Sequence, residues 1–214
     1  MRTDDLIDAL AAGAGPAPGM APRRRLGMVL AGGALAALVL VLAWLHMRHD
    51  LMQAMHGGMF WMKALYTGIL GLGGYLAIER LARPAGSGRR GWAVAGAVLG
   101  LFVLAGTAQA MMSPDIRMAM HMMRGHSWHV CSFNILALGI PMLALGLWAV
   151  RGMAPTHPTR AGFALGLFAG GTAATVYGLH CPENTFTFVA LWYSLGVLLV
   201  AALGALIGRW ALRW

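Results

Sequence analysis

Long apolar stretches separated by short polar ones dominate the chain from residue 26 onward. A helix needs about 20 predominantly apolar residues to cross the hydrocarbon core of a bilayer. Six stretches meet this requirement: Leu26–His46, Met59–Glu79, Gly91–Met112, His129–Val150, Ala161–Cys181 and Phe186–Gly208. The pattern therefore predicts an all-α fold, a polytopic membrane bundle of six transmembrane helices within residues 23–214.

Residues 1–22 follow a different pattern and form a separate segment before the bundle. The pattern predicts a short amphipathic helix, with acids in the first turn, where the helix dipole favours negative charge, and apolar residues on one face. These residues are Asp4, Asp5, Leu6, Ile7 and Leu10. A helix of about ten residues is marginal alone in water, so it either frays or is covered by a partner. The Gly- and Pro-rich run that follows predicts a flexible tether.

Composition supports the membrane interpretation. Of the 214 residues, 59% are hydrophobic and 11% are charged, whereas soluble domains have roughly 25% charged residues. Small residues recur four apart, a spacing that lets helix backbones approach closely in lipid. They are Gly96/Gly100, Gly162/Gly166/Gly170 and Gly204/Gly208. We expect them to pack the bundle, and they leave a homo-oligomer open.

The formal net charge of +9 has an uneven distribution along the chain. If the N-terminus is cytoplasmic, only Arg48, Lys63, Arg117 and Arg124 of the 16 basic residues lie outside, which leaves twelve inside. Cytoplasmic loops carry the excess of Lys and Arg, so this asymmetry predicts that both termini are cytoplasmic. It also explains the basic charge without nucleic acid as a direct partner.

The two cysteines lie near the same predicted outer face. Cys131 opens the fourth stretch and Cys181 closes the fifth, and consecutive antiparallel helices can bring these ends together. The pair could form a disulfide, bind a thiophilic metal, react as thiols, or pack as small buried side chains. His129, His180 and Glu183 are neighbours that could raise the thiolate fraction or contribute metal ligands.

Other candidate chemistry is sparse. No predicted span has an ionisable residue near its midplane, which argues against an ion-coupled transporter. The chain has neither a Cys-x-x-Cys motif nor a mid-span histidine, so no catalytic residue and no required cofactor are predicted. Seven of the eight histidines and eleven of the sixteen methionines lie on the outer side. A soft-metal, copper-type transport or delivery protein that uses these loops is therefore an alternative.

Several motifs resemble the NrsF family of membrane-embedded anti-sigma factors, over essentially the whole chain. The motifs are Thr3–Leu10, the stretch around Cys131, Ala154-Pro155 with Pro158 before Ala161-Gly162, Leu179-His180-Cys181-Pro182-Glu183, Trp192-Tyr193 and Arg213-Trp214. The resemblance implies that the N-terminal segment contacts an extracytoplasmic-function sigma factor. It also implies that Cys131 and Cys181 match the family's cysteine pair, which is linked to sensing heavy metals or oxidants.

We therefore expect an anti-sigma factor rather than an enzyme. It would hold its sigma factor at the membrane and release it when Cys131 and Cys181 react with an oxidant or transiently bind a thiophilic metal ion. The residues leave open whether the resting cysteines are thiols or a disulfide.

Overall fold

The computed structural model describes residues 2–13, 22–83, 86–153 and 155–213, and its regular elements in these ranges are all helical, as predicted. In chain order they are α1 (Thr3–Gly13), α2 (Pro22–Leu40), π-helix η1 (Val41–Leu45), α3 (Leu51–Met55), α4 (Gly58–Leu81), α5 (Arg89–Met111), α6 (Ile116–Arg124), α7 (Trp128–Val150), α8 (Pro158–Tyr177), α9 (Phe186–Phe188), π-helix η2 (Val189–Tyr193) and α10 (Ser194–Ala211).

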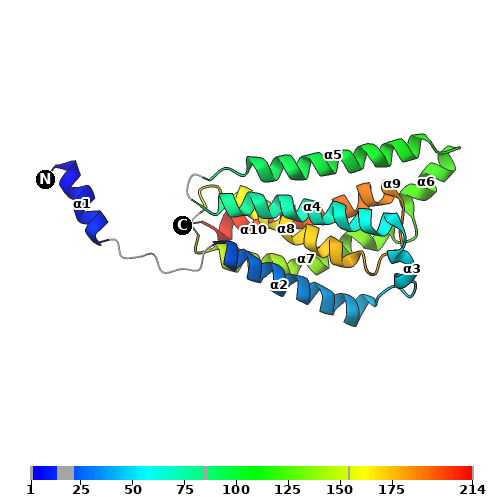
Figure 1. The fold of residues 1–214 in the computed structure, drawn as a ribbon, viewed down its shortest axis with the longest axis horizontal. Helices are drawn as coiled ribbons and strands as arrows, with labels where there is room; N and C mark the ends of the chain where they lie inside the picture. Colours follow the sequence, from blue (N-terminus) through cyan, green and yellow to red (C-terminus); the bar gives the residue numbers. More distant parts are fainter. Residues whose placement is uncertain (1, 14–21, 84–85, 154, 214) are drawn as a thin grey trace.

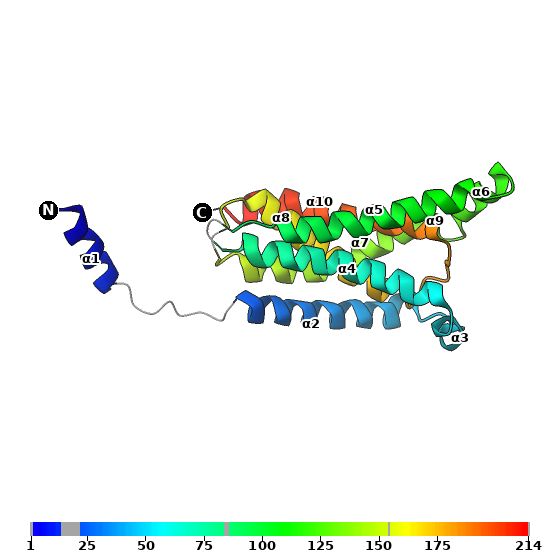
Figure 2. The same cartoon turned by 45° about the horizontal axis from the view of Figure 1, so that its top comes forward.

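The long helices run up and down beside one another in an elongated bundle (Figure 1). In the view of Figure 1, helices α2 and α5 lie along opposite sides, with α4, α7, α8 and α10 between them; α2 again lies along one edge in Figure 2. The connections after α2, α5 and α8 meet at one end, here called the cysteine end. The start of α2 and the end of α10 lie at the opposite end, here called the arginine end.

The six predicted stretches correspond to α2 with η1, α4, α5, α7, α8, and α9 through α10. One boundary is wrong in a way that affects the site. Helix α8 ends at Tyr177, so Cys181 lies in the connection that follows instead of in the last turn of the helix. This connection, residues 178–185, leads directly into α9.

Four helical stretches among the described residues are long and apolar enough to cross a membrane: Arg24–Leu45, Arg89–Met111, Ile116–Val150 and Phe186–Ala211. The third contains α6 and the turn before α7. Helices α4 and α8 fall outside this set, and both have many glycines. They have large buried faces, so the protein itself shields much of their surface. The chain is a multi-pass membrane protein.

Glycines let α8 contact its neighbours backbone to backbone. A Cβ added at Gly166 would lie under 3.0 Å from backbone atoms of Val200 and Ala201 on α10. Gly162 and Gly204 face each other across the same interface, and Gly71 meets Gly171 between α4 and α8. Small residues at these positions allow backbones to approach in lipid. In contrast, nothing lies within 4 Å of a Cβ at Gly96 or Gly100, so the packing predicted there is absent from the described chain.

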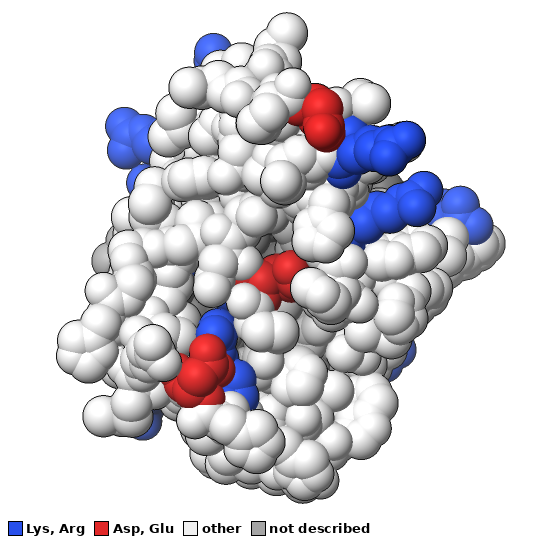
Figure 3. Space-filling view, turned by 90° about the vertical axis from the view of Figure 1, so that its right-hand side faces the viewer, with Lys and Arg blue, Asp and Glu red and all other residues white. Residues whose placement is uncertain are grey.

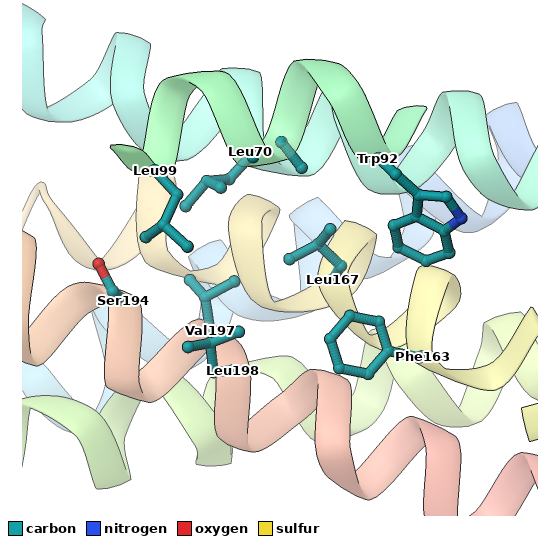
Figure 4. Close-up of a pocket in the computed structure, with 10 residues that line it drawn as sticks. Leu70, Trp92, Leu99, Phe163, Leu167, Ser194, Val197 and Leu198 are labelled. Atoms are coloured by element: carbon teal, nitrogen blue, oxygen red, sulfur yellow. The ribbon is translucent and has the colours of Figure 1, made fainter. Parts of the chain in front are cut away.

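Helix α5 packs closely on α4, where a Cβ added at Gly91 would lie under 3.0 Å from backbone atoms of Gly73 and Ala77, but it leaves a gap on its side facing α8 and α10. A pocket of about 170 Å³ lies between α5 and helices α4, α8 and α10 (Figure 4). Its walls are almost entirely apolar and include Trp92, Leu99, Phe163 and Leu167. The tight part of the bundle is therefore centred on α8.

We predict opposite effects for the same substitution at two helix glycines. Gly166→Ala should lower the free energy of unfolding by about 1–3 kcal/mol, because the added methyl group collides with the backbone of α10. Gly100→Ala has open space and should be neutral, or stabilising by up to roughly 1 kcal/mol, since Ala is the better helix former. Thermal unfolding of both variants in mild detergent checks this, and equal transition temperatures would contradict it.

Candidate functional site

The structure brings the two cysteines together at the cysteine end. Cys131 lies in the first turn of α7, and Cys181 lies in the connection between α8 and α9. Both are free thiols, both are fully buried, and their side chains lie close enough to interact. The antiparallel order of α7 and α8 produces this contact.

Polar groups of three other elements surround the thiols. Tyr177, in the last turn of α8, lies against Cys131, and Tyr193, at the end of η2, lies against Cys181. The hydroxyls of both tyrosines are buried, and neither makes a hydrogen bond of ordinary geometry in the described chain. Ser127 places its Oγ 3.9 Å from Cys181 Sγ. We call the two cysteines, the two tyrosines and Lys63, a buried lysine of α4 described next, the thiol cluster.

Lys63 carries the only charge in this cluster. It projects from α4, is 1% exposed, and its Nζ donates hydrogen bonds of 3.0 Å to the backbone oxygens of both Cys181 and Glu183. The same Nζ lies 5.7 Å from the ring centre of Tyr193. A buried ammonium is costly unless it is hydrogen-bonded, and these two carbonyls supply that compensation. The topology predicted from the sequence counted Lys63 among the charges on the outer side, and the structure shows that its side chain is buried.

A second cation holds the same connection from the rim. Arg48 donates from Nη1 to Cys181 O at 3.3 Å, and from its backbone N to Leu179 O at 3.3 Å. Its Nε and second Nη each donate to Asp50 at 2.7 Å. These side-chain hydrogen bonds lower the pKa of Asp50 to about 2.

The surface of the cysteine end is mostly uncharged, with a few charged groups set among uncharged residues (Figure 3).

Glu183 connects the Cys181 segment to the start of α7. Its Oε1 accepts hydrogen bonds from the backbone N–H groups of His126, at 2.6 Å, and Ser127, at 3.2 Å. A carboxylate is favourable at the N-terminus of a helix because it meets unpaired N–H groups and the positive end of the dipole. Gly125 has a φ of +54°, and a Cβ there would collide with the carboxylate. Glu183 therefore fixes the turn that begins the helix of Cys131.

The two histidines singled out from the sequence lie at the rim of this site. His129 is exposed and its ring contacts Trp128 edge-on, with centroids 5.9 Å apart. His180 has its Nδ1 2.8 Å from the backbone oxygen of His46. The described residues contain no group of three or more His, Cys, Asp and Glu side chains arranged to hold a metal ion. A thiophilic ion at this site would therefore depend chiefly on the two sulfurs.

Methionines gather on the neighbouring corner formed by α5 and α6. Met111 and Met112 are almost fully exposed, and Met118 and Met120 are exposed on α6. Two hydrogen bonds attach helix α6 to the chain that follows Cys181. The backbone oxygen of Met123 accepts from Trp192 Nε1 at 2.9 Å, and the backbone oxygen of Met122 accepts from Thr185 Oγ1 at 3.0 Å. The corner is thus held against the segment that follows Cys181.

The N-terminal helix α1 is separate from the bundle (Figure 1). It starts at Thr3, has Asp4 and Asp5 in its first turn, and buries no residue. Its apolar side chains are open to solvent: Leu6 is 44% exposed, Ile7 57% and Leu10 66%. Most of the predicted Gly- and Pro-rich tether falls at residues 14–21, outside the described residues.

These features can be compared with known proteins. The family described as "Negative regulator of sigma F", NrsF, matches residues 10–214 of the chain. The chain belongs to the NrsF family. It is 63% identical to the "Anti-sigma-F factor NrsF" of Caulobacter vibrioides (strain NA1000 / CB15N), over 100% of both chains. It is 40% identical to the "Probable anti-sigma-F factor NrsF" of Azospira oryzae (strain ATCC BAA-33 / DSM 13638 / PS), again over 100% of both chains.

Membership in the NrsF family confirms the resemblance seen in the sequence motifs and makes the chain a regulatory protein, not an enzyme. No solved structure matches it. The sequence pointed to the cysteines and, through the Trp192-Tyr193 motif, to Tyr193 without a role, but not to Lys63 or Tyr177. A lone lysine in the second turn of an otherwise apolar span was the one available signal for Lys63.

Lys63→Met should destabilise the fold and expose Cys181. Removing the ammonium leaves two buried carbonyls without their charged donor, and a hydrogen bond to a charged group contributes about 1.5–3 kcal/mol. Unfolding in mild detergent and the rate of maleimide labelling at Cys181 are the measurements. Arg117→Met, which removes an exposed positive charge on α6, is the control and should change stability by less than about 0.5 kcal/mol. If Lys63→Met had the stability and the Cys181 labelling rate of the wild type, Lys63 would not be what holds the Cys181 connection in place.

Proposed function

We propose that this chain is an anti-sigma factor of the bacterial inner membrane. It binds an extracytoplasmic-function sigma factor through α1 and releases it when Cys131 and Cys181 react. Family membership and the names of the two relatives support the regulatory role. The observation that carries the mechanism is the pairing of two buried free thiols at one end of a membrane bundle with an uncovered amphipathic helix attached to the other.

The proposed topology has six membrane spans with both termini in the cytoplasm. The arginine end would then face the cytoplasm, in agreement with twelve of the 16 basic residues. Exposed tryptophans lie near both ends of the bundle, as in membrane proteins whose indoles lie at the two interfaces. They are Trp44, Trp61 and Trp128 at the cysteine end, and Trp148 and Trp210 at the arginine end.

Helix α1 provides the surface for the sigma factor. An isolated helix of 11 residues is marginal in water, and its uncovered apolar side chains would be stabilised by a partner groove. Leu6, Ile7 and Leu10 supply the apolar contacts, while Asp4 and Asp5 supply negative charge that steers a basic partner surface. No described residue of the bundle provides a competing contact, because α1 buries nothing.

Changing one face of α1 should separate binding from folding. Leu10→Asp places a charge in the apolar face and should weaken sigma-factor binding at least about tenfold, or 1.4 kcal/mol. Ala12→Asp adds the same charge on the opposite face of the helix and should bind nearly as well as the wild type. Co-purification of the sigma factor with membranes that contain each full-length variant measures this. Equal retention by both variants would rule out the apolar face as the binding surface.

The thiol pair is the proposed input. Hypochlorous acid can take two electrons from the two thiols, so that a disulfide forms together with chloride, water and a proton. A divalent thiophilic ion can instead replace the two thiol protons and bind both sulfurs. Either product changes the contact between Cys131 on α7 and the connection held by Lys63 and Glu183. A tenfold loss of sigma-factor affinity requires about 1.4 kcal/mol of coupling between the two sites.

Replacing both thiols should abolish the response. In cells, Cys131→Ser with Cys181→Ser should keep sigma-dependent transcription low before and after exposure to mercuric ion or hypochlorite. Met111→Leu with Met112→Leu removes two exposed thioethers nearby and should leave induction intact. A full response in the cysteine variant would eliminate the thiol switch. If only the methionine variant lost the response, a soft-metal function of the outer surface would be favoured.

A further inference from the structure

A groove at the arginine end lies outside both proposed functional sites. It has a volume of about 600 Å³ and runs between the first turns of α2 and the last turns of α7. It is lined by Arg25, Met28, Val29, Leu145, Trp148 and Ala149. Trp148 is 79% exposed, and Met28 and Leu145 are also exposed, so the groove opens on the outside of the bundle.

Helices α2 and α7, which form the groove, come into contact farther from the arginine end. Gly33 on α2 is so close to Met142 on α7 that an added Cβ would lie under 3.0 Å from that side chain. Gly33 follows Arg25 by eight residues, roughly 12 Å along the helix. The contact at Gly33 therefore limits the groove toward the bilayer centre, and the open part near the arginine end can take the part of an acyl chain next to its headgroup.

A positive charge stands at the mouth of this groove. Arg25 is half-buried, and its Nη1 lies 3.6 Å from the position of a Cβ at Gly152. It forms no ion pair within the described ranges, where Glu79 pairs with Arg83 and Asp50 with Arg48. The exposed side chains of Arg24 and Arg151 adjoin it in sequence, next to Arg25 and Gly152 respectively. The mouth of the groove is thus cationic and unneutralised.

We propose that this groove binds one anionic phospholipid. Its phosphate meets Arg25, and one acyl chain lies along Met28, Leu145 and Trp148. A guanidinium matches phosphate oxygens through paired hydrogen bonds, and basic pockets between transmembrane helices suit anionic headgroups. An extended peptide would not fit, because its backbone groups would face hydrocarbon without partners.

The bound lipid would stabilise α2 against α7 at the point where the N-terminal segment joins the bundle. This inference rests on the membrane placement proposed above, and it is independent of the thiol switch and of the sigma factor. Lipid binding can therefore fail while the anti-sigma function stands, and the reverse is also true.

Native mass spectrometry of the full-length protein in mild detergent tests the proposal, with phosphatidylglycerol and the zwitterionic phosphatidylethanolamine as probes. The wild type should retain one phosphatidylglycerol with roughly tenfold preference. Arg25→Gln should abolish most of this preference. Arg209→Gln makes the same charge change at an exposed position on α10 and should preserve it. Leu145→Trp fills the groove without changing charge and should reduce retention of both lipids.

Two results would overturn the lipid site. One is equal retention of the two lipids by the wild type. The other is the same preference in Arg25→Gln as in Arg209→Gln. A protein dimer that Leu145→Trp dissociates would also overturn it, because a second copy of the chain would then occupy the groove. Circular dichroism of each variant establishes that its helices are intact.

Discussion

The buried ammonium of Lys63 is the constraint on which the cysteine end depends. It holds the carbonyl oxygens of Cys181 and Glu183, and so fixes a connection with no regular structure against helix α4. The carboxylate of Glu183 then fixes the start of α7, where Cys131 lies. The position of one thiol relative to the other therefore follows from two charged groups, Lys63 and Glu183, while Arg48 holds the same connection from the rim.

The remainder of the bundle gives this end a rigid base. Helix α8 meets α4 and α10 through glycine contacts that leave no space for a side chain. Packing of this kind resists gradual deformation, so a changed thiol contact would be accommodated by a discrete shift of a helix or connection. Helix α7 joins the two ends, with Cys131 in its first turn and the lipid-facing groove beside its last turns. It is the most direct physical link between the thiols and the segment that carries α1.

Much of this architecture could be predicted from the sequence, because apolar runs in lipid specify helices almost by length alone. The bounds of α4 and α7 agree with the predicted stretches to within one or two residues. The proximity of Cys131 and Cys181 could be expected because the fourth and fifth helices are consecutive and antiparallel. The environment of Lys63 could not, because a charge in a sequence suggests exposure and its acceptors are backbone carbonyls about 120 residues away. The roles of Tyr177, Tyr193 and the Glu183 cap depend on the same non-local packing.

In the proposed mechanism, reaction at the buried thiols lowers affinity for the sigma factor at the other end of the bundle. The most direct measurement is the dissociation constant of the sigma factor for the full-length protein in lipid nanodiscs, before and after one equivalent of mercuric ion. We expect at least about tenfold weaker binding after addition, reversed by excess thiol. An unchanged dissociation constant, with both Cys131 and Cys181 shown to have reacted, would contradict it.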